Sequence, residues 1–292
     1  MAFTNKDVMD LRAKTGVGMM DCKKALTEAD GDMEKAVEIL REKGMATGAK
    51  RASKIASQGI VDAYVSGNIA VLLEVNCESD FVARGDQYTS FVREISKYIA
   101  NSDVTTVEEV KANNADLLNE TVARIGEKIE IRRFEKFVSD NKLESYIHMG
   151  GKIGVIVEMS ANSSDEVAHD IALQIAAANP SYISSKEVPA QEIEKEKEIL
   201  TAQALNEENP KPLAIIEKMV LGRINKYYKE VCLNEQVFVK DGEKAVKDML
   251  KENGNLSVLK FARFTMGEGL EKKEENLANE VEEQIAKAKS NN

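Results

Sequence analysis

The chain has 292 residues, of which 43% are hydrophobic, enough for two or three compact units. Its net charge of −10 disfavours tracking of a nucleic-acid backbone, because such binding depends on Lys and Arg neutralising phosphates. The chain lacks a secretory signal at its start and any run of roughly 20 apolar residues that could span a membrane. We therefore expect a cytoplasmic protein without a direct nucleic-acid or membrane partner.

Residues 1–54 are predicted to form a small three-helix domain followed by a linker. Thr4 and Asp7 have the spacing of a capping box at the start of the first helix, and Gly44 is expected to end the third. The basic stretch 44–58 predicts a solvated linker or an extended helical arm. A nucleic-acid patch is disfavoured there because no aromatic side chain is interleaved for base stacking.

From residue 59 the hydrophobic period changes from helical to strand-like. Residues 60–65 and 69–75 flank a Ser-Gly-Asn turn and predict a β-hairpin, which an amphipathic helix follows. Residues 146–149 and 153–159 predict a second hairpin, again followed by such a helix. Two copies of a strand-strand-helix unit predict an α+β core with antiparallel sheets, built by duplication.

The two copies differ by an insertion. Ile69 aligns with Ile153 at an offset of 84 residues, whereas Phe91 in the following helix aligns with Val167 at an offset of 76. The first copy therefore holds eight additional residues between strand and helix, in the stretch that includes residues 79–83 (SDFVA). Because loops on rigid scaffolds commonly carry function, this segment is the predicted working tip.

The remaining segments complete the predicted architecture. A helix ends near Gly126, and the helices 187–205 and 213–231, joined by a Pro-containing turn, form a protruding αα-hairpin. The apolar stripe of this hairpin must be buried on the core, on a second copy or on a partner. Strand-like residues follow at 236–239 and 256–264, and a C-terminal helix is expected at about 277–289.

These elements predict a division into domains. The boundaries are residues 1–54 for the three-helix domain and linker, 55–140 for the first core subdomain, 141–182 and 231–264 for the two parts of the second, 183–230 for the helical hairpin or dimerisation arm, and 265–292 for a C-terminal helical module.

Signatures of covalent catalysis are missing from the sequence. It contains no phosphate-binding loop, dinucleotide fingerprint or nucleophile elbow. With only His148 and His169, a histidine-rich metal site is excluded and few general bases are available. Cys22, Cys77 and Cys232 lack metal-ligand spacing and predict reduced, mostly buried thiols. We therefore predict a protein that acts by binding another protein, without a cofactor or metal of its own.

Two further features predict contacts with a partner. Met19 and Met20 are adjacent, so their side chains point in different directions, and flexible methionines suit adaptable protein contacts. The alternative, with one methionine in the thin core and the other incidentally exposed, is equally compatible with the sequence. His148 ends a strand beside a Gly-Gly turn, where it could face a partner.

Three motifs resemble those of the elongation factor Ts family. Residues 15–26 (TGVGMMDCKKAL) are similar to its amino-terminal signature, and residues 74–83 (EVNCESDFVA) to its second, with Ser79 where the family usually has Thr. Residues 125–127 (IGE) with 131–133 (IRR) resemble a third. The similarity runs over the whole chain, although Val237 stands where the family often has Pro.

The resemblance implies a three-helix ubiquitin-associated-like amino-terminal domain, a duplicated α+β core and a protruding helical hairpin that permits a homodimer. It implies a guanine nucleotide exchange factor that binds elongation factor Tu in its GDP-bound and nucleotide-free forms, displaces Mg²⁺, and promotes GDP release and GTP loading during translation elongation. By the same resemblance, Mg²⁺ dislocation falls to Ser79, Asp80, Phe81 and Val82, and partner binding to Arg12, Met19, Met20, Lys23, Ile125, Gly126, His148 and Val239.

Two other classes of function compete with this interpretation. A structural or assembly protein that oligomerises through its arm would explain the hairpin but not the insertion in one copy. An enzyme that uses dispersed carboxylates would fit the acidic composition, but the spacing of the acidic residues does not support it.

Overall fold

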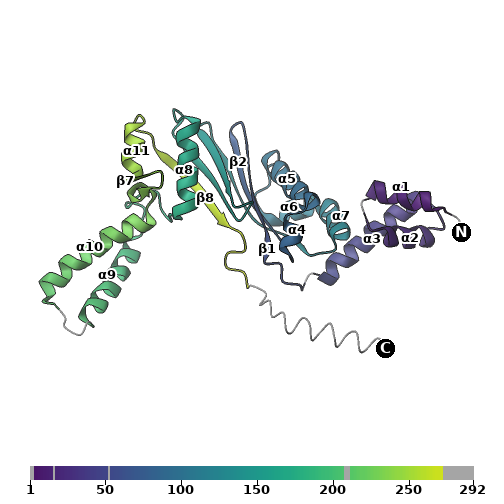
Figure 1. Ribbon diagram of the computed structural model, residues 1–292, viewed down its shortest axis with the longest axis horizontal. Helices are drawn as coiled ribbons and strands as arrows, with labels where there is room; N and C mark the ends of the chain where they lie inside the picture. Colours follow the sequence, from purple (N-terminus) through teal and green to yellow (C-terminus); the bar gives the residue numbers. More distant parts are fainter. Residues whose placement is uncertain (1–2, 16, 52, 207–210, 272–292) are drawn as a thin grey trace.

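The computed structural model describes residues 3–15, 17–51, 53–206 and 211–271. Its core of sheets and helices lies in the middle of an elongated molecule, with the amino-terminal helices at one end and a helical hairpin at the other (Figure 1). The fold is α+β, as predicted. The C-terminal helix expected at 277–289, and with it most of the predicted module 265–292, lies outside the described residues.

The amino-terminal unit contains three helices, α1 (Asn5–Thr15), α2 (Met19–Glu28) and α3 (Met33–Arg51). The predicted capping box is present, since Asp7 Oδ2 accepts a hydrogen bond from the Thr4 amide at 2.6 Å and Thr4 Oγ1 accepts one from the Asp7 amide at 3.4 Å. A small apolar cluster holds the helices together; it includes Val8, Leu11, Cys22, Ala25, Leu26, Ala36 and Leu40.

The prediction that the third helix ends at Gly44 is wrong. Helix α3 continues to Arg51, so the basic stretch begins as an extended helical arm and not as a loop. Gly44 is buried against helix α7 (Ala115–Ile125), which explains a glycine inside a helix: the space that a side chain would need is already occupied.

The core is built from two antiparallel three-stranded sheets of the same topology. One has the order β1-β2-β3 and the other β4-β5-β8. Their strands are β1 (Gln58–Ser66), β2 (Ile69–Cys77), β3 (Ile129–Val138), β4 (Lys142–His148), β5 (Ile153–Met159) and β8 (Val258–Thr265). Even the register irregularities match, since the central strand shifts at Glu74/Val75 in one sheet and at Glu158/Met159 in the other.

In both copies the helices come between the second and third strands in the order of the sequence. The first copy carries α4 (Asp80–Ala83), α5 (Asp86–Ala100), α6 (Val107–Asn113) and α7, and the second carries α8 (Asp165–Ala178), α9 (Ala190–Leu205), α10 (Leu213–Val231) and α11 (Val246–Glu252). A short 3₁₀ turn (Leu233–Glu235) and the two-stranded β6–β7 sheet (Val237–Phe238 and Asp241–Ala245) precede α11. Neither α6 nor α11 was predicted, because each is a single short segment of two turns.

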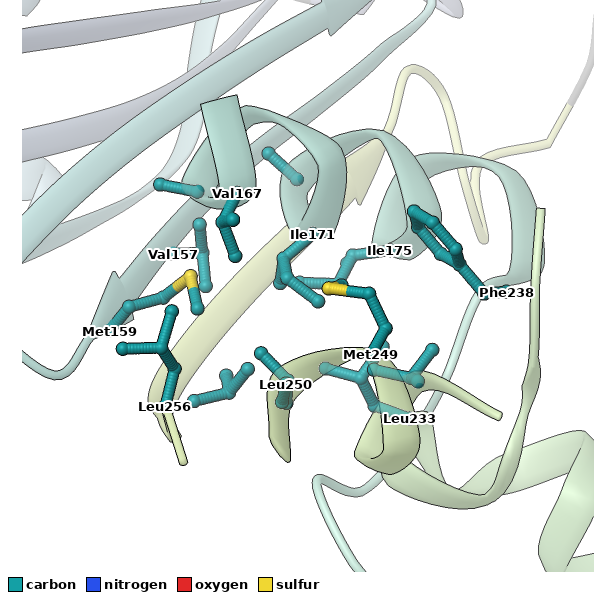
Figure 2. Packing of buried hydrophobic residues seen from close by; sticks show 14 of the residues in the cluster. Val157, Met159, Val167, Ile171, Ile175, Leu233, Phe238, Met249, Leu250 and Leu256 are labelled. Atoms are coloured by element: carbon teal, nitrogen blue, oxygen red, sulfur yellow. The ribbon is translucent and has the colours of Figure 1, made fainter. Parts of the chain in front are cut away.

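The strands pack in layers, with one face of each sheet toward the other sheet and one toward helices. In β2, Val71 and Leu73 contribute to the cluster with α5, whereas Leu72 contributes to the cluster between the sheets, where it joins Ile156 of β5. The outer face of the second sheet is covered in the same way. Figure 2 shows Val157 and Met159 of β5 beside Val167 and Ile171 of α8, with Met249 and Leu250 of α11 below Ile171 in the same cluster.

The αα-hairpin buries its apolar stripe between its own two helices. Ile193 and Ala204 of α9 pack with Ile216, Val220 and Ile224 of α10, so the stripe predicted to need another surface is largely covered. At the base, Glu192 accepts hydrogen bonds from the hydroxyls of Tyr227 and Tyr182, which lower the pKa of its carboxyl.

Gly154 of β5 provides a test of the contact between the sheets. A methyl group at this position would lie 2.4 Å from Val61 Cγ1 and 2.9 Å from Leu72 Cδ1, both in the opposite sheet. Gly154→Ala is expected to destabilise the protein by about 1–3 kcal/mol through overpacking, measured by urea denaturation. Gly242→Ala is the control, because a methyl group there meets no atom within 4 Å. Equal unfolding midpoints for the two variants would contradict this account.

Candidate functional site

The predicted tip forms the short helix α4, which is held at its start by Ser79. The Ser79 hydroxyl accepts a hydrogen bond from the Val82 amide at 3.3 Å, as an N-cap residue does. The same hydroxyl and the Ser79 amide donate to the two carboxylate oxygens of Glu127, at 2.7 and 3.0 Å. In the second copy, residues 160–164, all of them described, join β5 to α8 without a helix.

Phe81 projects from this helix into solvent. Its side chain is 88% exposed, more than any other large apolar side chain among the described residues. Its neighbours point the other way: Ala83 is buried and Val82 is half-buried against the cluster of the first sheet and α5. The helix is therefore anchored through Val82 and Ala83 and presents Phe81 outward, as expected for a working tip.

Asp80 lies beside Phe81 and is also exposed. Its carboxylate pairs with the Arg84 guanidinium one turn later, at 3.0 Å, and both side chains are more than half accessible to solvent. Ion pairs of this exposed kind contribute at most about 1 kcal/mol to stability. The Asp80 carboxylate can therefore exchange Arg84 for another cationic or hydrogen-bonding group at little cost.

The residues directly before the tip, Cys77 and Glu78, are held by hydrogen bonds. Glu78 accepts hydrogen bonds from Arg51 Nη1 and from the Lys128 amide, each at 2.7 Å. Beneath it, the Cys77 thiol donates to the Ser79 carbonyl at 3.1 Å, and its burial raises its pKa to about 12. Cys77 is thus a protonated structural thiol at neutral pH, in agreement with the prediction that the three cysteines are free and buried.

Ile125 and Gly126 lie at the end of α7, next to the tip. Gly126 adopts the left-handed conformation (φ 78°) that ends this helix and turns the chain toward Glu127. Ile125 lines a groove of about 360 Å³ together with Phe81, Val82 and Arg124. The structure therefore brings these two predicted contact residues together with the insertion.

The predicted contact residues of the amino-terminal unit lie on its surface. Met19 and Met20 are 47% and 64% exposed, so the alternative in which one of them fills the core is wrong. Arg12 and Lys23 are exposed as well. We refer to Arg12, Met19, Met20 and Lys23 as the methionine face.

His148 and Val239 are exposed on the second copy and are not part of the tip. His148 is the last residue of β4, and its Nδ1 lies 3.1 Å from the Tyr146 hydroxyl. Val239 follows β6, and its amide donates to Gln174 Oε1 of α8 at 2.8 Å. His169 is exposed on α8, with the Tyr146 ring edge-on to its own.

Comparison with known proteins decides the family. The family model described as Elongation factor TS matches residues 78–268. Curated relatives described as Elongation factor Ts cover nearly the whole chain: one from Clostridium perfringens (strain SM101) is 50% identical over 96% of this chain and 98% of its own length. Another from Clostridium botulinum (strain Eklund 17B) is 49% identical over 97% and 99%. The chain belongs to the elongation factor Ts family.

The elongation factor Ts family match begins at Glu78, directly before the tip, and ends at Glu268. It contains β3, the second sheet and the hairpin, whereas β1 and β2 precede it. The amino-terminal helices lie outside it too, although the relative from Clostridium perfringens covers 96% of this chain. Among the described residues, no helix is long and apolar enough to cross a membrane. In the same part of the chain, no group of three or more His, Cys, Asp or Glu side chains could hold a metal ion.

Several residues that hold the site were not predicted to do so. Glu127 belongs to a family motif, but its role in holding Ser79 depends on a contact between residues 48 positions apart. Glu74 was visible as a charged residue in an apolar strand. It is fully buried, is paired with Arg132 and Arg133 at 2.9 and 2.6 Å, and accepts the Gly267 amide at 2.7 Å.

The cap of α4 gives a testable consequence. Ser79→Ala removes the hydroxyl that accepts from Val82 and donates to Glu127, so we expect the helix to lose about 1 kcal/mol of local stability. Hydrogen exchange of the Val82 amide should accelerate by about fivefold. Ser79→Thr keeps the hydroxyl and should exchange like the wild type. Unchanged Val82 exchange in Ser79→Ala would rule out the capping role.

Proposed function

We propose that this chain is the guanine nucleotide exchange factor of elongation factor Tu and promotes GDP release and GTP loading. Family membership makes it an elongation factor of protein biosynthesis, and the curated relatives carry the name Elongation factor Ts. The observation that carries the proposal is the outward Phe81 on an anchored helix, with an exposed carboxylate beside it. The chain acts by protein–protein binding in the cytoplasm, without covalent chemistry, a cofactor, or a nucleic-acid or membrane partner.

The tip would act on the partner's Mg²⁺. Residues 79–82 enter the nucleotide-binding domain, where Phe81 forces packed side chains apart and Asp80 perturbs the polar groups around the ion. Mg²⁺ neutralises phosphate charge, so its displacement weakens GDP binding. Because the Ser79 cap and the Val82 and Ala83 contacts already order the tip, little conformational entropy is lost on insertion.

Thermodynamic linkage explains why binding of the factor lowers the partner's affinity for GDP. A factor that binds the nucleotide-free partner more tightly than the GDP-bound form must lower the affinity for GDP by the same ratio. The remaining predicted contacts supply this binding free energy from areas away from the nucleotide. They are the methionine face, Ile125 and Gly126 beside the tip, and His148 and Val239 on the second copy.

The exposed Phe81 ring should contribute much of the acceleration of GDP release. Phe81→Ala removes an aromatic contact of the kind that contributes about 2 kcal/mol or more at interface centres, so GDP release at limiting factor should slow by about thirtyfold. Asp80→Ala should slow release to a smaller extent. Stopped-flow release of fluorescent GDP from elongation factor Tu measures both.

Leu259→Ala is the matched control, because Leu259 is exposed but belongs to β8 and not to the tip. It should leave GDP release unchanged. Full acceleration by a Phe81 and Asp80 double variant would exclude the insertion mechanism. Retention of elongation factor Tu from cytosol, and its loss on addition of GDP, tests the partner and the direction of linkage.

We further propose that the hairpin α9–α10 mediates a homodimer. Apolar side chains remain exposed on both helices, namely Ile199, Leu205, Leu213, Ile215 and Leu221. Obligate self-association surfaces are enriched in such residues. The hairpin has its own apolar cluster, so deletion of the hairpin should remove few packing contacts from the core.

Replacement of residues 187–230 by a short Gly-Ser linker should therefore halve the mass measured by light scattering and leave the urea unfolding midpoint of the core nearly unchanged. A monomeric wild-type chain would exclude the homodimer. An unfolded deletion variant would show that the hairpin belongs to the core.

A further inference from the structure

Helix α3 joins the amino-terminal unit to the base of the tip. Its first half contributes Ala36 and Leu40 to the amino-terminal cluster. Its last residue, Arg51, pairs with Glu78 at 2.7 Å, directly before the tip. A single helix thus connects the unit that carries the methionine face with the segment that carries Phe81.

Helix α7 lies against α3 and makes the same connection from the core side. Near its start, Asp116 pairs with Arg41 of α3. Near its end, Arg124 Nε donates to the Thr15 carbonyl at 3.1 Å, which ties the end of α1 to the core. After α7, Glu127 holds the Ser79 amide and hydroxyl.

Gly44 lies where α3 is in direct contact with α7. A Cβ atom at this position would be 2.9 Å from Ala123 Cβ and 3.0 Å from the Asn119 carbonyl oxygen. The second contact is with backbone, which cannot rotate out of the way. Any side chain at Gly44 must therefore push α3 away from α7 and displace the amino-terminal unit. We call this contact the α3–α7 seam.

We propose that Gly44 is a positioning residue for nucleotide exchange: the α3–α7 seam presets the methionine face relative to Phe81, so that one encounter engages both. This inference rests on the exchange function proposed above. Two linked contacts held at the correct separation reinforce each other without a new interaction, and the gain is lost when their geometry is wrong. The α3–α7 seam therefore acts on the affinity for the partner, whereas the tip acts on GDP release.

The test compares Gly44→Gln with Gly222→Gln. Both glycines are inside helices and Gln favours the helix, but a Cβ atom at Gly222 would meet no atom within 4 Å. Spin labels on Ala13→Cys in α1 and Ala112→Cys in α6, both at exposed positions, report the separation of the amino-terminal unit from the core. The native thiols are buried, and the chain without added cysteines measures their background labelling.

We expect Gly44→Gln to shift or broaden the distance distribution and Gly222→Gln to leave it unchanged. In GDP release, the half-saturating concentration of Gly44→Gln should rise by about tenfold, with the maximal rate retained, because the tip is intact. An unchanged distance distribution, or a lost maximal rate at an unchanged half-saturating concentration, overturns the proposal.

Two further comparisons distinguish failure of the proposed exchange function from failure of the proposed role of the α3–α7 seam. If the wild-type chain does not accelerate GDP release, the exchange function fails, while the label distances still test the α3–α7 seam. If Gly44→Gln does not fold, Gly44→Ala replaces it, and Gly44→Ala combined with Ala123→Gly removes one of the two clashes. Because the contact with the Asn119 carbonyl oxygen remains, partial recovery toward the wild-type distance and half-saturating concentration in that double variant supports the α3–α7 seam, and the absence of any recovery overturns it.

Discussion

The fold depends on the face-to-face packing of two small sheets. A small sheet needs its apolar faces covered to be stable, and here the central strands β2 and β5 are largely buried on both faces. One face of each sheet is therefore covered by the other sheet, and its opposite face is covered by helices. Gly154 allows the close approach, since a methyl group there would meet side chains of the opposite sheet. With both faces of each sheet covered, an insertion can only extend outward, and α4 does so.

The tip combines exposure with order. An exposed Phe on a mobile loop would lose conformational freedom on binding and would favour aggregation, whereas Phe81 is fixed by the Ser79 cap and the half-buried Val82 next to it. The hydrogen bonds from Ser79 to Glu127 connect this order to α7 and hence to the amino-terminal unit. The same helix thus supports the tip and holds the amino-terminal unit through α3 and the end of α1.

The hairpins and their helices could be predicted from the sequence because each follows from the periodicity of hydrophobic residues. The duplication and the place of the insertion followed from aligning the two copies. The strand-like segment 256–264 was recognised, but its place as the third strand of the second sheet was not predicted, since its partner β5 lies far away in sequence. Gly44 was interpreted as a helix end because glycine is a helix breaker, whereas its role depends on Ala123, which only the folded chain brings near. The layers and the Glu127 contact are likewise long-range.

The position of β8 has a consequence for synthesis of the chain. The β4–β5 hairpin is complete at Met159, but the strand that closes its open edge begins only at Val258. At about 5–20 residues per second, a ribosome needs roughly five to twenty seconds to make the residues between them. The first sheet, complete at Val138, can fold earlier and offer its inner face to the waiting hairpin, while α9 and α10 form locally from neighbouring sequence. The amino-terminal half can thus serve as a template for the second, an order of folding that the duplicated architecture makes available.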